Sequence, residues 1–135
     1  MGEPAHNLDP ALEQLHGMLW EYAALPQGWN GYRAVPPNKR ALERARRALD
    51  QASMAGLLPE RVVPDVEGGV GLEWFGCGVL DGGARRRLAS TTCDNDGDLV
   101  AGIEDRVSGE LETWELDEGE LALTLQRFRD FLGVA

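Results

Sequence analysis

The residues most able to bind ligands or take part in catalysis are carboxylates gathered in one segment of the chain. Between residues 94 and 120 the sequence holds eleven Asp and Glu residues and a single basic residue, Arg106. This segment therefore accounts for the whole formal charge of −10 of the 135-residue chain. Paired carboxylates can act as general acid and base where an apolar setting raises one pKa. The sequence singles out no such pair, so the pattern favours binding over catalysis.

The cysteines and histidines do not form a recognisable catalytic or metal-binding pattern. Cys77 and Cys93 lack CxxC spacing, and neither His6 nor His16 has a second ligand close in sequence. Cys77 and His16 are a conceivable nucleophile and base. However, Cys77 lies in a glycine-rich stretch without a helix start to activate the thiol. We therefore predict no metal, no cofactor and no enzymatic activity, with an enzyme of unknown type as an alternative.

Two turn-like stretches resemble ligand-binding motifs only superficially. DNDGD, at residues 94–98, is rich in carboxylates, but an EF-hand loop needs glycine sixth and glutamate twelfth. Those places hold Leu99 and Asp105. In GCGVLDG, at residues 76–82, the third glycine is one place late for a dinucleotide fingerprint. We interpret DNDGD as a hairpin turn, since Asn, Asp and Gly tolerate the backbone angles of tight hairpins.

The connection GWNGYRAVPP, at residues 28–37, carries two aromatic side chains between two predicted helices. Trp29 and Tyr32 are a possible stacking platform for a base or sugar. The alternative is a clasp, in which glycines turn the backbone and both rings cover the gap between the helices. Only Arg33 supplies a positive charge to this loop, so we favour the clasp.

Capping signals predict two N-terminal helices. Asp9 followed by Pro10 begins the first, and leucines at spacings of three and four give it an apolar face. Asn38 caps the second, and Gly56 ends it. Its apolar face is made mostly of small residues: Ala41, Leu42, Ala45, Ala48, Leu49 and Ala52.

The second helix also carries a broad basic face. Its basic residues at helical spacing are Lys39, Arg40, Arg44 and Arg47. Such a face can contact phosphates. Glu43 lies four places before Arg47, and Arg46 four places before Asp50. This spacing favours ion pairs along the helix surface instead.

The pattern then changes to the alternation of β-strands. GGVGLEWF places Val70, Leu72 and Trp74 on one side, and RRRLASTTC, LVAGIED and ELETWEL follow with short turns between them. Asp117 and Glu120 form a capping box that opens a last helix. Its expected core face is Leu121, Leu125, Phe128 and Leu132. Short connections require antiparallel strands.

We therefore predict one α+β domain over residues 1–135. It has two N-terminal helices, a meander of three to four antiparallel strands and a C-terminal helix, packed in two layers. The sequence shows no basic and apolar leader and no apolar run long enough to cross a membrane, so we expect a cytoplasmic protein.

Three stretches resemble a family of small uncharacterised bacterial proteins. LPQGWNGYRAVPPNKRALERA, GGVGLEW and the strand that closes on DNDG are similar to that family's GWDGYGAPP-like and GG-[VI]-x-LEW motifs, over about residues 25–105. This chain departs from the pattern with Asn30 for Asp and Arg33 for Gly. Some family members resemble the first partner of two-gene cassettes, which implies an antitoxin or immunity role.

Charge and resemblance together suggest a non-enzymatic acidic protein that inhibits a basic protein partner. An acidic surface repels nucleic acid and membrane phosphates and attracts cationic surfaces. We expect the contacts at Glu104, Glu110, Glu112 and Glu115. An alternative is a phage-type mimic of nucleic acid that inhibits a defence nuclease, as anti-CRISPR proteins do. The oligomeric state and the role of the segment before Leu8 stay open.

Overall fold

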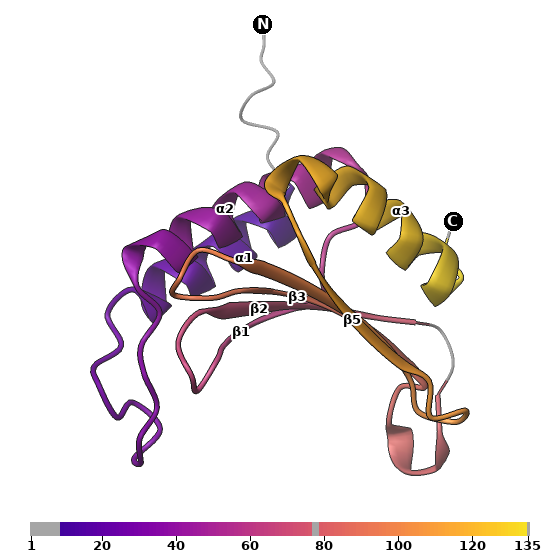
Figure 1. The fold of residues 1–135 in the computed structure, drawn as a ribbon, viewed down its shortest axis with the longest axis horizontal. Helices are drawn as coiled ribbons and strands as arrows, with labels where there is room; N and C mark the ends of the chain where they lie inside the picture. The colour runs from indigo at the N-terminus through magenta and orange to yellow at the C-terminus, as the bar shows by residue number, and fades with distance from the viewer. Residues whose placement is uncertain (1–8, 77–78, 135) are drawn as a thin grey trace, which may run out of the picture.

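The fold is α+β, with one antiparallel sheet covered by helices on one face. A computed structural model of the chain describes residues 9–76 and 79–134. Its elements are α1 (Pro10–Tyr22), α2 (Lys39–Met54), β1 (Arg61–Pro64), β2 (Val70–Phe75), β3 (Arg87–Cys93), β4 (Leu99–Asp105), β5 (Leu111–Leu116) and α3 (Leu121–Leu132). The strands pair in chain order, β1-β2-β3-β4-β5, as the predicted meander requires. Figure 1 shows all three helices on the same side of the sheet.

The prediction of three to four strands is wrong, because the sheet has five. The missing strand is β1, whose four residues end in Pro64. A strand this short has no alternation to recognise, and proline cannot donate to a ladder. Tertiary pairing makes the strand: Val62 lies opposite Leu72 of β2 and is completely buried. β1 is an edge strand, where proline is tolerated.

The predicted helix starts are confirmed at atomic detail. The Asp9 carboxylate accepts a hydrogen bond from the backbone N–H of Ala11, and the Asn38 side chain accepts one from that of Ala41, both at 2.9 Å. Asp117 and Glu120 form the expected reciprocal capping box. The box caps one turn of 3₁₀ helix, Glu118–Glu120, which leads directly into α3. These caps satisfy backbone N–H groups that have no partner within the helix.

The core lies between the helices and the sheet. Trp74 of β2 is 2% exposed, and its ring centroid lies 5.1 Å from that of Phe128 in α3. The indole Nε1 donates to the carbonyl oxygen of Leu57 at 2.8 Å, so the one polar atom of this ring is satisfied. Burial of each such large side chain stabilises the fold by about 2–3 kcal/mol. The whole predicted face of α3 is buried.

Helix α2 is the central helix of the layer. Its alanines at positions 41, 45, 48 and 52 are almost fully buried, so the helix backbone can approach its neighbours closely. α2 contacts α1, α3, β2 and β3. Apart from Met54, the exposed side chains of α2 are charged. None of the helices in the described ranges combines the length and apolarity needed to cross a bilayer.

Candidate functional site

The acidic segment does not form a single surface, because its carboxylates have different partners. Asp105, at the end of β4, is only 4% exposed. Its oxygens accept hydrogen bonds from Nε of Arg86 at 3.1 Å and Nε of Arg87 at 3.3 Å. Oδ1 also accepts from the backbone N–H groups of Val107 and Ser108. The bond from Arg86, aided by that from Val107, holds the pKa of this carboxyl well below its usual range. Asp105 is therefore a structural residue.

Three more of the acidic residues lie near an arginine. The pairs are Glu104 with Arg106 at 3.9 Å, Glu112 with Arg127 at 2.6 Å, and Glu118 with Arg47 at 3.0 Å. The guanidinium of Arg127 also lies over the ring of Trp114, 4.3 Å from its centroid. Ion pairs to β3, α2 and α3 thus neutralise part of a segment that the sequence shows as almost purely acidic.

The four glutamates predicted as partner contacts do not lie together. Adjacent residues of a strand point to opposite faces of the sheet. Glu112 is on the helix side with Trp114, which packs against α3, whereas Glu115 is on the open side. Glu104 is also on the open side, opposite Leu111, the first residue of β5. Glu115 is the fifth residue of that strand, so it lies about 13 Å further along the sheet. Glu110 precedes β5 in the turn.

A different set of carboxylates does come together, at the other end of β5. A hollow of about 280 Å³ lies where the start of β4, the end of β5 and the entry to α3 meet. We call it the acidic hollow, and its lining residues are Asp98, Leu99, Glu115, Leu116, Asp117 and Glu120. The lining contains four carboxylates and no lysine or arginine. Of the four predicted glutamates, only Glu115 belongs to it.

Two of these carboxylates have a structural task and two do not. Asp117 and Glu120 form the capping box of the 3₁₀ turn that leads into α3. The carboxylates of Asp98 and Glu115, by contrast, have no hydrogen-bond or ion-pair partner among the described residues. Four carboxylates around one hollow make it a region of negative potential. Asp98 and Glu115 are the residues of the hollow best suited to a cationic group from outside.

The loop at residues 28–37 is a structural clasp, as predicted, but only one of its two rings takes part. Trp29 Nε1 donates to the carbonyl oxygen of Val35 at 3.1 Å. The side-chain oxygen of Asn30 accepts from the backbone N–H groups of Tyr32 and Ala34. Tyr32 is 76% exposed, so the expectation that both rings cover the gap is wrong. The loop closes on hydrogen bonds of its own.

The DNDGD turn proves to be a hairpin, as predicted, and it also fastens this loop to α2. Asn95 Oδ1 accepts from the backbone N–H of Asn38, and Asn95 Nδ2 donates to the carbonyl oxygen of Pro36. Gly68, from the GGVGLEW stretch, has a φ of +98°, a conformation that residues with a Cβ rarely adopt, and a Cβ there would also crowd the Asn95 amide. The three motif stretches thus meet at one corner and hold it together. Sequence spacing offered no sign of this meeting.

The thiol and imidazole groups show no catalytic arrangement in the described part of the chain. Cys93 is buried in β3, and burial raises the pKa of its thiol to about 12, so the group stays protonated. His16 Nε2 lies 2.9 Å from Asp50 Oδ1. Cys77 and His6 lie outside the described residues. Within residues 9–76 and 79–134, no group of three or more His, Cys, Asp or Glu residues is arranged to hold a metal ion.

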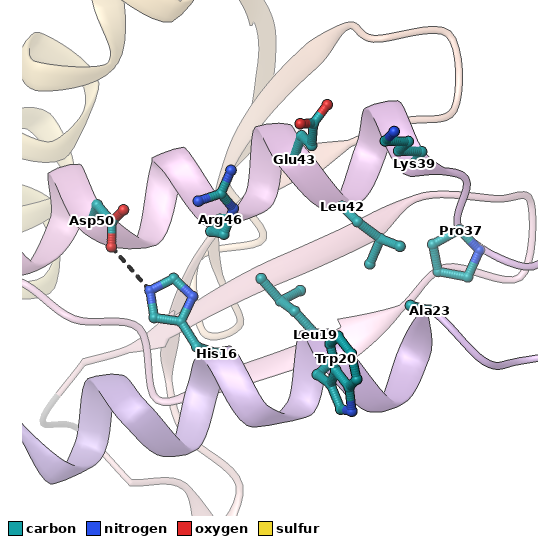
Figure 2. Close-up of a pocket in the computed structure, with 10 residues that line it drawn as sticks. All are labelled: His16, Leu19, Trp20, Ala23, Pro37, Lys39, Leu42, Glu43, Arg46 and Asp50. Atoms are coloured by element: carbon teal, nitrogen blue, oxygen red, sulfur yellow. Dashed lines mark hydrogen bonds and ion pairs between the residues drawn. The ribbon is translucent and has the colours of Figure 1, made fainter.

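A second hollow, which the sequence did not indicate, is a groove between α1 and α2. Figure 2 shows its lining, and its volume is about 610 Å³. We call it the helix groove, and its lining residues are His16, Leu19, Trp20, Ala23, Pro37, Lys39, Leu42, Glu43, Arg46 and Asp50. Trp20 is 82% exposed, and Leu42, expected in the core, borders the groove half-buried. A row of charged side chains on α2 therefore runs along the apolar lining, and α1 contributes His16, Leu19 and Trp20 on the other side.

Comparison with known proteins adds no relative to this description. No family model, no curated protein and no solved structure matches the chain. Function is therefore inferred from the geometry and charge of the two hollows.

Proposed function

We propose that this chain is a non-enzymatic binding protein whose acidic hollow docks a basic protein partner and neutralises it. The single observation that supports this proposal is the set of four carboxylates lining one hollow without a cation. A lysine or arginine of a partner, placed between Asp98 and Glu115, relieves their repulsion and forms charge-assisted hydrogen bonds. Neutralisation then follows from occlusion of the partner's own functional surface.

The net charge of the chain supports the same type of partner. A protein of net charge −10 repels nucleic acid and anionic membranes at long range and accelerates encounter with cationic proteins. The carboxylates of the acidic hollow sit at one end of the sheet, so the hollow gives this attraction a local focus. Resemblance of the loop and strand motifs to proteins of two-gene cassettes supports an antitoxin or immunity role in the cytoplasm.

The proposal moves the centre of the predicted interface along β5. Glu115 stays in it, and Asp98 joins it. Glu112 serves the fold through Arg127, and Glu104 and Glu110 are peripheral because they lie toward the opposite end of the strand. An experiment can therefore distinguish an interface at Glu104 and Glu110 from one at Asp98 and Glu115.

The test is affinity capture with the tagged chain in its own host, followed by titration of the recovered partner. Asp98→Asn with Glu115→Gln should weaken binding roughly tenfold at about 50 mM salt, and less at about 300 mM. Glu104→Gln with Glu110→Gln removes the same charge and is the matched control, with an expected change below about twofold. None of these substitutions touches the α3 cap.

The opposite ranking of the two double variants would move the interface to the turn between β4 and β5. Equal and small effects from both would show that the acidic residues only solubilise the chain. A partner that nucleic acid displaces in direct competition would point to mimicry of nucleic acid instead.

A further inference from the structure

Helix α2 carries two rows of charged side chains, one paired within the molecule and one largely unpaired. We call Arg40, Arg44 and Arg47 the inner row, because they face the β3–β4 turn and the entry to α3. Arg40 Nη1 donates to the carbonyl oxygen of Asp96, and Arg44 and Arg47 lie 3.9 and 3.0 Å from the carboxylate of Glu118. The three arginines of the inner row thus have partners within the molecule. Of the four basic residues considered for phosphate binding, only Lys39 has no such partner among the described residues.

The other row lies along the helix groove and alternates in sign. We call it the outer stripe, and its members are Lys39, Glu43, Arg46 and Asp50. Their spacings of four, three and four follow the helical period, so the four side chains lie along one face. Figure 2 shows the stripe along α2 beside the groove.

Three of the four members of the outer stripe are unpaired among the described residues, although their spacing permits pairing. Lys39, Glu43 and Arg46 have no hydrogen bond or ion pair with any described residue, and Asp50 contacts only His16. The predicted Arg46–Asp50 and Glu43–Arg47 pairs are therefore absent from the described structure, and Arg47 turns to Glu118 instead. Three of the four alternating charges therefore have no partner among the described residues, and Asp50 meets only His16, which leaves the stripe able to contact a surface outside the chain.

The groove beside the stripe supplies an apolar contact area. Leu19 of α1, Ala23 just after α1 and Leu42 of α2 line it, and Pro37 closes one end. Trp20 stands at its border with 82% of its surface exposed. Exposed aromatic side chains beside an apolar groove are typical anchors of protein interfaces. The groove and stripe together make a candidate docking face.

The order of charges identifies the occupant. When two copies of α2 pack antiparallel about a two-fold axis between Glu43 and Arg46, Lys39 of each copy meets Asp50 of the other. In the same arrangement Glu43 of each copy meets Arg46 of the other. All four contacts are attractive, whereas a parallel alignment in register places like charges together. We propose that a second copy of this chain docks here, with the two outer stripes antiparallel and Trp20 of each copy covered.

Charge reversal tests this pairing with an internal rescue. The purified chain should sediment as a dimer at about 100 µM and dissociate on dilution. Glu43→Arg places two arginines opposite each other, and Arg46→Glu places two glutamates opposite each other, so each variant alone should be a monomer. Their equimolar mixture should form a heterodimer, because the reversed charges then match. The double variant Glu43→Arg with Arg46→Glu should recover the homodimer.

Control variants separate pairing from folding and from general charge. Glu110→Arg is an equal charge reversal far from α2, and it should leave the dimer intact. Trp20→Ala should weaken dimerisation at least about tenfold, because buried aromatic side chains carry a large share of the binding free energy of interfaces. Recovery in the mixture also excludes misfolding as the cause of the monomeric state.

Three results would overturn the proposal. A wild-type chain that stays monomeric at about 100 µM leaves the face to a different occupant. Single reversals that still dimerise exclude the stripe from the interface. A mixture of the two reversals that stays monomeric excludes the antiparallel two-fold arrangement. These measurements use the purified chain alone, so they do not depend on the acidic hollow or its proposed partner.

Discussion

Asp105 and Glu115 come from the same acidic segment but have opposite environments. Asp105 is buried and receives hydrogen bonds from two arginines and two backbone N–H groups. Glu115 is exposed, has no partner among the described residues and shares its hollow with three other carboxylates. The difference shows that a run of acidic residues is not a function in itself. The partners of each carboxylate decide whether it stabilises the fold or is available for binding.

The strongest way to break this comparison is to neutralise Asp105. Asp105→Asn keeps the acceptor for Val107 and Ser108 but leaves two arginine side chains without their anion, so we expect the largest loss of thermal stability among the acidic positions. Asp105→Ala, which also removes the acceptor, should lose more. The measurement is the unfolding midpoint of each variant against the wild type.

Asp105 also predicts a specific pH dependence. Its folded-state pKa is lowered from the ordinary value of about 3.9. As pH falls, the unfolded chain therefore takes up this proton first, and the stabilisation present above about pH 4 is lost on further acidification. The stability gap between wild type and Asp105→Asn should narrow between about pH 5 and about pH 2. A gap that stays constant with pH would show that the charge of Asp105 is not the stabilising feature.

A smaller effect is expected at Glu118, which is paired but partly exposed. Glu118→Gln removes the anion shared by Arg44 and Arg47. Because the carboxylate side chain is 37% exposed, we expect a loss of only about 0.5 kcal/mol in the free energy of unfolding. Added salt should reduce this difference further. A loss as large as that of Asp105→Asn would mean that α2 and α3 depend on this pair for their packing.

The smallest effect should have the opposite sign. Asp98→Asn with Glu115→Gln relieves repulsion in the acidic hollow, so the free energy of unfolding should rise by about 0.3 kcal/mol at low salt. Chemical denaturation at two salt concentrations measures it. Destabilisation would contradict the absence of partners and would assign the two carboxylates a structural role.

Local patterns predicted most of the elements. The spacing of apolar residues and the caps at Asp9, Asn38 and Asp117 place all three helices, because capping depends on residues close in sequence. Alternation of Val70, Leu72 and Trp74 identifies β2 and its buried side in the same way. β1 escaped prediction because its four residues become a strand only through pairing with β2.

The candidate sites could be predicted only in part, for the same reason. The acidic segment and the exposed charges of α2 are visible in the sequence, but the partner of each charge is not. Glu112 and Arg127 are fifteen residues apart, and Arg47 and Glu118 seventy-one. The helix groove joins residues of α1 to residues of α2 and has no counterpart in any short stretch.

By itself, the sequence determined the helices, four of the five strands, the order of the meander and the total charge. These follow from periodicity, turn residues and composition, which act over a few residues at a time. Only the tertiary structure decided which carboxylates are paired, which charges on α2 are free and where two helices leave a groove. Ion pairs and hollows depend on distances in space, and the chain sets those distances only when its helices pack on the sheet.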